Sequence, residues 1–184
     1  MVGYHNQPAE TAQVIDADGW FHTGDIGELD AIGRVIITDR LKNIIVLANG
    51  KNVAPAPMEI ALATSKYIAQ AVIMGDQQPY TGALIAPDFE ELGSWAAANG
   101  LAEAPPEELV ADDRVEKLFH TEVRAKLDDF AAYERPRRIA LLPRLLTEEE
   151  GEMTPSLKVK LRVVKERWAD KVAYLFDEDR ESGD

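Results

Sequence analysis

Two nearly continuous apolar runs in the middle of the chain constrain its fold more than any other feature. Ile68–Met74 contains one polar side chain and Gly82–Ala86 contains none, while the polar stretch Asp76–Thr81 separates them. A strand with one solvated face would alternate apolar and polar residues, so these runs predict strands that are buried within a sheet. Because 46% of the 184 residues are apolar, the chain has enough apolar surface for a packed core.

Helices are predicted on both sides of these strands, where they can cover the sheet. A helix is predicted over Pro55–Ser65, because Pro55 and Pro57 suit the first turn of a helix. Asp88–Asn99 and Val115–Tyr133 place large apolar residues at helical spacing. The Pro- and Glu-rich segment Ala102–Glu108 is predicted to link these two helices.

The last third of the chain adds one strand and one helical region. Ile139–Leu142 has the composition of a short strand, and Thr147–Pro155 is an acidic, glycine-containing loop. Ser156–Phe176 carries apolar residues at helical spacing in its later part. The charged tail from Asp177 is expected to be frayed.

The first 50 residues are predicted to form two hairpins after a polar extension. Residues 1–18 are polar, with helix potential at Pro8–Val14. Trp20–Leu29 and Val35–Thr38 flank turn residues and predict a β-hairpin. Asn49-Gly50, which follows the β-branched run Ile44–Leu47, predicts a second, smaller hairpin. The order of elements from about residue 41 therefore indicates an α+β domain with helices against a small sheet.

Composition excludes several classes of function. The net charge of −13 argues against nucleic acid as a general partner, because phosphate binding needs clustered cations. Cysteine is absent, and His5, His22 and His120 are dispersed, so no metal site is expected. There is no secretory signal and no apolar run of about 20 residues. A cytoplasmic protein is expected, with peripheral contact to a membrane left open.

Two charged motifs near the amino terminus are candidates for nucleotide binding. In Gly19–Asp25, GWFHTGD, the Asp25 carboxylate could cap a turn or accept two hydroxyl protons from a ribose. Asp39-Arg40-Leu41-Lys42 could be a solvated linker. It could also be a hinge, with Arg40 pairing to ribose or phosphate and Lys42 absorbing a torsional change.

A third motif, Gly151–Lys160, places two lysines after a loop. A lysine held by Thr154-Pro155 could bring a compact cation against a carboxylate and an α-phosphate at once. Alternatively, Lys158 and Lys160 are surface lysines that precede a helix.

The order of these motifs resembles a known family. GWFHTGDIGELD, DRLKNIIVLANGKNVAPAPMEI and GEMTPSLKVK are similar to three consecutive signatures of the AMP-forming acyl-CoA synthetases, members of the adenylate-forming superfamily. ITDRLKNII, GKNVAPAPMEI and GALIAPDFEEL look most like the long-chain fatty acid–CoA ligase branch. The resemblance extends from Gly3 to about Phe176. In that family a small, mobile carboxy-terminal domain follows a large AMP-binding domain.

The resemblance implies a role for each matched residue. Asp25 would hold the ribose hydroxyls of ATP or acyl-AMP, and Arg40 would contact the same ribose. Lys42 would be the hinge between domains, and Gly50 would line the pantetheine tunnel used by CoA. Lys158 matches the catalytic lysine, which would bridge the fatty-acid carboxylate and the α-phosphate. The family uses ATP, CoA and magnesium, and no magnesium ligands are expected in this chain.

The resemblance also implies a division of the chain. Residues 1–40 would be terminal strands of the large domain, and residues 41–184 the mobile domain. The sequence departs from the family's usual residues at Asn43, Ala48-Asn49 and Leu161. These departures concern the detailed contacts of the hinge and of CoA. The sequence contains no Ser/Thr/Gly-rich loop that could grip phosphates, and no acidic magnesium motif or acyl tunnel precedes residue 19, so the chain is expected to be inactive alone.

Three explanations of such a chain remain open: a ligase fragment, a subunit of a split enzyme or non-catalytic interaction module, and an inactive remnant. In each case the strands of residues 1–40 would expose edges, and either association with a second copy or local disorder is expected there.

Overall fold

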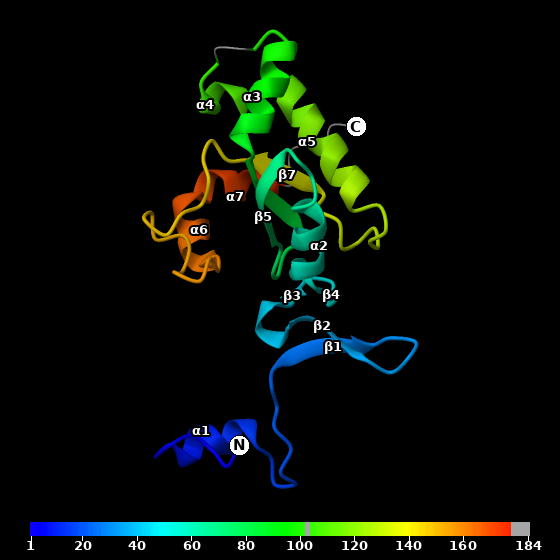
Figure 1. Ribbon diagram of the computed structural model, residues 1–184, viewed down its shortest axis with the longest axis vertical. Helices are drawn as coiled ribbons and strands as arrows, with labels where there is room; N and C mark the ends of the chain where they lie inside the picture. The colour runs from blue at the N-terminus through cyan, green and yellow to red at the C-terminus, as the bar shows by residue number, and fades with distance from the viewer. Residues whose placement is uncertain (102–103, 178–184) are drawn as a thin grey trace. The chain divides into compact units, whose positions relative to one another are not determined.

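The chain divides into two units, Met1–Ile44 and Ile45–Asp184. The computed structural model describes residues 1–101 and 104–177 (Figure 1). The predicted functional division after residue 40 is close to this boundary but remains a prediction. Among the described residues, no helix is both long enough and apolar enough to cross a bilayer.

The first unit contains one short helix and one hairpin. Helix α1 spans Pro8–Val14, where helix potential was predicted. Strands β1 (Asp25–Leu29) and β2 (Val35–Arg40) pair antiparallel, which confirms the first hairpin. A 3₁₀ turn, Leu41–Asn43, follows β2.

The apolar side chains of the first unit lack a core. Within residues 1–44, all of which the structure describes, Asp39 is the one buried residue. The hairpin exposes large apolar side chains at Leu29, Ile32, Val35, Ile36 and Ile37. Several exposed large apolar side chains on one hairpin are typical of a surface that another polypeptide segment covers.

The second unit begins with the predicted small hairpin and then builds its main sheet. Strands β3 (Ile45–Val46) and β4 (Asn52–Val53) are antiparallel. The main sheet has the order β5-β6-β7. Strands β5 (Ile68–Met74) and β6 (Gly82–Pro87) are antiparallel, whereas β7 (Arg138–Leu141) is parallel to β6. The two apolar runs are therefore neighbouring strands, as predicted.

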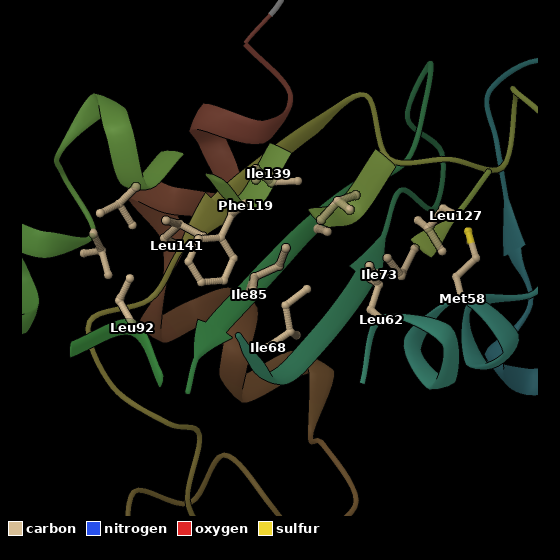
Figure 2. Close-up of a cluster of buried hydrophobic side chains, with 14 of the residues drawn as sticks. Met58, Leu62, Ile68, Ile73, Ile85, Leu92, Phe119, Leu127, Ile139 and Leu141 are labelled. Atoms are coloured by element: carbon tan, nitrogen blue, oxygen red, sulfur yellow. The ribbon is translucent and has the colours of Figure 1, made fainter. Parts of the chain in front are cut away.

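Both faces of this sheet are covered, which explains why its strands do not alternate in polarity. On one face Ile73, Ile85 and Leu141 belong to the same buried cluster as Phe119 (Figure 2). That layer is formed by α2 (Pro55–Leu62), α3 (Phe89–Ala98), α4 (Pro106–Leu109) and α5 (Asp113–Lys126).

The other face of the sheet packs against the last two helices. These are α6 (Leu161–Arg167) and α7 (Ala169–Leu175), orange to red in Figure 1. Val72, Leu84 and Ala140 turn toward this layer. Helix α7 lies so close to β6 that a Cβ added at Gly82 would be 3.1 Å from the Cβ of Leu175. The predicted α+β class, a small sheet with packed helices, is confirmed.

Three predicted segments differ in detail. The helix predicted to reach Tyr133 ends at Lys126. Two acidic residues, Asp128 and Asp129, follow its carboxy-terminal end, where the helix dipole disfavours negative charge. The side chain of Arg135 donates to the Phe130 carbonyl at 2.7 Å, and this contact holds the chain in turns.

The other two differences are a helix in the linker and a break in the last helical region. Pro106–Leu109 forms a turn of helix, because proline at its start and glutamates in its first turn favour initiation. Residues 102 and 103 of the predicted linker lie outside the described residues, as does the tail from residue 178. The last helical region is interrupted at Trp168, whose backbone leaves the helical conformation.

Candidate functional site

Asp25 and Arg40 face each other across the first hairpin. They are register partners at the open end of β1 and β2. The Arg40 Nε lies 2.9 Å from the Asp25 Oδ1, and the arginine side chain is 68% exposed. The Thr23 hydroxyl accepts from the Asp25 backbone N–H at 3.1 Å. The structure therefore brings together the two residues that the resemblance assigns to one ribose.

The predicted hinge is organised around a buried carboxylate. Asp39 is 6% exposed, and its Oδ1 accepts from the Arg40 backbone N–H at 2.6 Å. The same oxygen accepts from the Asn43 side chain at 3.1 Å. Asn43, which departs from the family pattern, thus closes the 3₁₀ turn, and Lys42 extends from that turn into solvent.

The aromatic and histidine residues of GWFHTGD have a local structural role. The His22 Nε2 lies 3.1 Å from the Asp16 Oδ2, and the other Asp16 oxygen accepts from the Trp20 backbone N–H at 2.8 Å. That backbone hydrogen bond is the main cause of the lowered pKa of Asp16. No cluster of three metal-ligating side chains occurs in residues 1–101 or 104–177.

Gly50 forms the turn of the second hairpin. Its φ of +81° lies in the left-handed region, and its N–H donates to the Leu47 carbonyl at 2.8 Å. A Cβ at this position would meet no atom within 4 Å. Backbone conformation therefore accounts for the glycine without a ligand.

Lys158 lies on a small hairpin that is anchored at its base and exposed at its tip. The Thr154 N–H donates to the Lys158 carbonyl at 2.8 Å, and Met153 bridges Val159. The tip is a turn in which Leu157 has a φ of +58°. Within the described residues, the Lys158 ammonium makes no hydrogen bond or ion pair, and its side chain is exposed.

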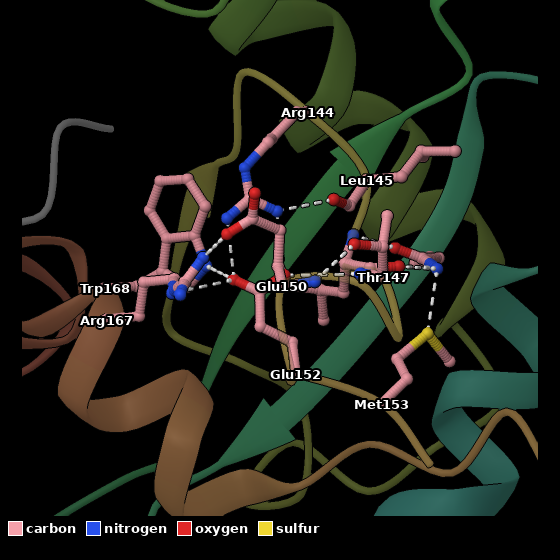
Figure 3. Close-up of polar contacts among 10 residues, drawn as sticks. Arg144, Leu145, Thr147, Glu150, Glu152, Met153, Arg167 and Trp168 are labelled. Atoms are coloured by element: carbon pink, nitrogen blue, oxygen red, sulfur yellow. Dashed lines mark hydrogen bonds and ion pairs between the residues drawn. The ribbon is translucent and has the colours of Figure 1, made fainter. Parts of the chain in front are cut away.

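The base of this hairpin contains a buried ion pair (Figure 3). Glu152 is 0% exposed, and its two oxygens accept from the Arg144 guanidinium at 2.7 and 2.9 Å. The Trp168 indole N–H donates to the same carboxylate at 3.0 Å, and the Thr147 N–H does so at 3.3 Å. Burial raises the pKa of Glu152, but these donors outweigh burial, so the pKa lies below its ordinary value.

The sequence did not reveal this network. Glu152 follows three other glutamates, so it could be taken for one more solvated charge. Arg144 and Trp168 are separated from it by 8 and 16 residues, and neither spacing has a local signature. Among the predicted residues, only Asp25 and Arg40 are joined by a hydrogen bond or ion pair within the described part of the chain.

Comparison with known proteins links this architecture to one group of enzymes. Residues 42–125 match the family described as "AMP-binding enzyme C-terminal domain". The chain is 39% identical over 179 residues to the long-chain-fatty-acid–CoA ligase FadD15 of Mycobacterium tuberculosis. It is 36% identical over 177 residues to long-chain-fatty-acid–CoA ligase 1 of Cavia porcellus.

These alignments cover 96% and 95% of this chain, but 30% and 25% of the respective relatives. The chain thus spans less than a third of the length of the ligases it matches. A solved structure, the A domain of carboxylic acid reductase from Segniliparus rugosus in complex with AMP and a co-purified carboxylic acid, has a TM-score of 0.75 and 26% identity. That match covers 96% of this chain and 26% of the reductase domain.

Proposed function

The chain belongs to the AMP-forming acyl-CoA synthetases as a carboxy-terminal part, and on this premise we propose that it completes a long-chain fatty acid–CoA ligase. The complete enzyme would convert a fatty acid, ATP and CoA into acyl-CoA, AMP and pyrophosphate through an acyl-adenylate. The observation that carries the proposal is the exposed Lys158 on an anchored hairpin, within a chain 39% identical to a ligase of this class.

Lys158 would act in the first half-reaction. Its ammonium would lie between the fatty-acid carboxylate and the α-phosphate while the carboxylate attacks phosphorus and pyrophosphate leaves. At about 4 Å and an effective dielectric constant near 20, one such charge contact is worth about 4 kcal/mol before desolvation. The absence of an internal ion pair at Lys158 within the described residues supports this role, since no resident carboxylate competes with the substrate.

Asp25 and Arg40 would bind the ribose of ATP and of the acyl-adenylate. The Asp25 side chain is 25% exposed and can accept from ribose hydroxyls while it holds Arg40. Lys42 would serve as the hinge between the two catalytic poses, and the turn at Gly50 would line the path of the CoA pantetheine. Magnesium would be bound outside the described residues of this chain, which offer no cluster of ligands for it.

A large AMP-binding domain would be the principal partner, joined in the same polypeptide or docked as a separate one. The exposed apolar residues of β1 and β2 support this assignment, because they match the kind of surface that a neighbouring sheet covers. Without that domain the chain would be inactive, and its first hairpin would pair with a second copy. Light scattering of the isolated chain should then detect dimers that dissociate when the large domain is added.

A chimera provides the test. The corresponding segment of FadD15 is replaced by this chain, and ATP–pyrophosphate exchange is measured with palmitate. We expect exchange and palmitoyl-CoA synthesis by the chimera and neither by the isolated chain. Robust ATP–pyrophosphate exchange by the isolated chain would contradict the claim that a large domain is needed. A folded chimera without exchange would contradict the proposed function.

Single variants of the chimera then test Lys158. Lys158→Ala should reduce adenylation by about 10²–10³-fold, the range for loss of one transition-state donor. Conversion of supplied palmitoyl-adenylate to palmitoyl-CoA should be less affected. Lys165→Ala, on the exposed part of α6, is the matched control and should leave both steps unchanged. Equal loss in the two half-reactions would contradict the assigned role.

A further inference from the structure

The hairpin that carries Lys158 is joined to the body of its unit through Glu152. The backbone N–H of Glu152 donates to the Thr147 carbonyl at 3.0 Å, and its carbonyl accepts from the Lys160 N–H at 2.7 Å. Glu152 therefore pairs with the return limb of the hairpin only two residues beyond Lys158. Its side chain lies in the buried network of Figure 3.

The Glu152 carboxylate connects three segments that are distant in the sequence. Arg144 binds both of its oxygens, from the segment that follows β7. Trp168 donates from the break between α6 and α7, and the Arg144 guanidinium lies 5.0 Å from the centre of the Trp168 ring. Arg167 Nε is 3.9 Å away. A charge held by this many donors has a defined position, because any rotation would break several charge-assisted hydrogen bonds.

The next residue, Met153, is held by apolar packing and by an uncharged hydrogen bond. Met153 is 8% exposed and belongs to the apolar cluster between the sheet and helices α6 and α7. The amide of Gln70 in β5 donates to the Met153 sulfur at 3.5 Å and to the Leu146 carbonyl at 3.1 Å. The base of the hairpin is thus fixed by an ion pair and by core packing, whereas the tip has neither.

We propose that Glu152 is a positioning residue for Lys158. It never touches substrate; it fixes the position and direction of the hairpin so that the lysine ammonium reaches the reacting carboxylate and phosphate. The inference rests on the proposed function only for what Lys158 does. Precise placement matters because a displacement of about 1 Å at a reacting group can cost about 10²-fold in rate.

Hydrogen exchange of the 184-residue chain tests the anchoring without any catalytic assay. Glu152→Gln preserves size and one acceptor but removes the charge that binds Arg144. The Lys160 amide should exchange at least about 10-fold faster in this variant, as expected for the loss of about 1.4 kcal/mol of local protection. Amides in β6 should keep their protection.

The matched control is Glu166→Gln, which removes an exposed carboxylate from an ion pair with Arg162 on α6 and should leave the Lys160 amide unchanged. If Glu152→Gln fails to fold, Trp168→Phe removes one donor to the carboxylate and keeps the aromatic ring, and the same amide is followed. Unchanged exchange at Lys160 in the variant that folds would overturn the proposal.

The chimera tests whether the anchoring acts through Lys158. Glu152→Gln should lower kcat for adenylation by at least about 10-fold, with little change in the KM for ATP. In the Lys158→Ala background it should cause no further loss, because there is no ammonium left to position. An equal loss in both backgrounds would assign Glu152 a general structural role and overturn the proposal. If Lys158→Ala itself leaves adenylation intact, the proposed function fails, while the exchange experiment still decides whether Glu152 holds the hairpin.

Discussion

Removing Arg144 should be among the most damaging single changes in the second unit. Arg144→Met would keep most of the aliphatic length of the side chain but leave the Glu152 carboxylate buried with its main counter-charge gone. Loss of one partner from a buried ion pair costs about 3–5 kcal/mol. We expect the lower end, about 3 kcal/mol, because Arg144 is 36% exposed and Trp168 and Thr147 still donate to the carboxylate.

Urea denaturation followed by far-UV circular dichroism at pH 7 measures this loss. The signal reports mainly on the second unit, which contains every α-helix of the described residues except α1. With a urea dependence of about 1–3 kcal/mol per molar, the midpoint should fall by about 1–3 M. The double variant Arg144→Met/Glu152→Gln should recover most of the stability, because the buried charge is then absent.

The same experiment at lower pH checks the electrostatic cause. The pKa of Glu152 lies below 4.5 in the folded chain, so its contribution is present above pH 4.5 and is lost as the pH falls through the native pKa. Arg144→Met removes the strongest factor that lowers this pKa, and burial then favours the protonated acid. The difference between the variant and the parent chain should therefore shrink below pH 4.5. A loss under about 1 kcal/mol at pH 7, or one independent of pH, would refute the reasoning.

Three further predictions concern the core, a turn and a helix cap. Met58→Ala in α2 should cost about 2–5 kcal/mol in urea denaturation, since Met58 is 0% exposed. Ile60→Ala on the same helix, at 68% exposure, should cost less than about 0.5 kcal/mol. Gly50→Ala should lower stability by about 1–2 kcal/mol, because alanine is strained in the left-handed backbone conformation of this position. An unchanged melting temperature would contradict this prediction. NMR titration should find Asp112 with a pKa of about 2, because the Arg114 side chain and backbone N–H bind its carboxylate. Its contribution to stability is present above pH 3.8 and is lost as the pH falls through about 2.

The fold could be predicted from the sequence where local pattern and tertiary packing agree. The runs over β5 and β6 are apolar because both faces of the sheet are covered, and the same apolar residues form the two clusters. The turn at Gly50 was predictable because its backbone conformation excludes most other residues. Prediction failed at the end of α5, where apolar spacing continues toward Tyr133 but the Arg135 side chain binds the Phe130 carbonyl, a contact that apolar periodicity does not register.

The sequence by itself determined the order of elements and the resemblance to the family, and it predicted Asp25, Arg40 and Lys158 as candidate site residues, because periodicity and short motifs are local properties. Tertiary structure alone decided which charges are buried. Glu152 belongs to an acidic stretch whose other members stay in water, yet it lies at 0% exposure against Arg144. Burial of a charge depends on donors that converge from separate segments, and nothing in the spacing of residues 144, 152 and 168 specifies that convergence.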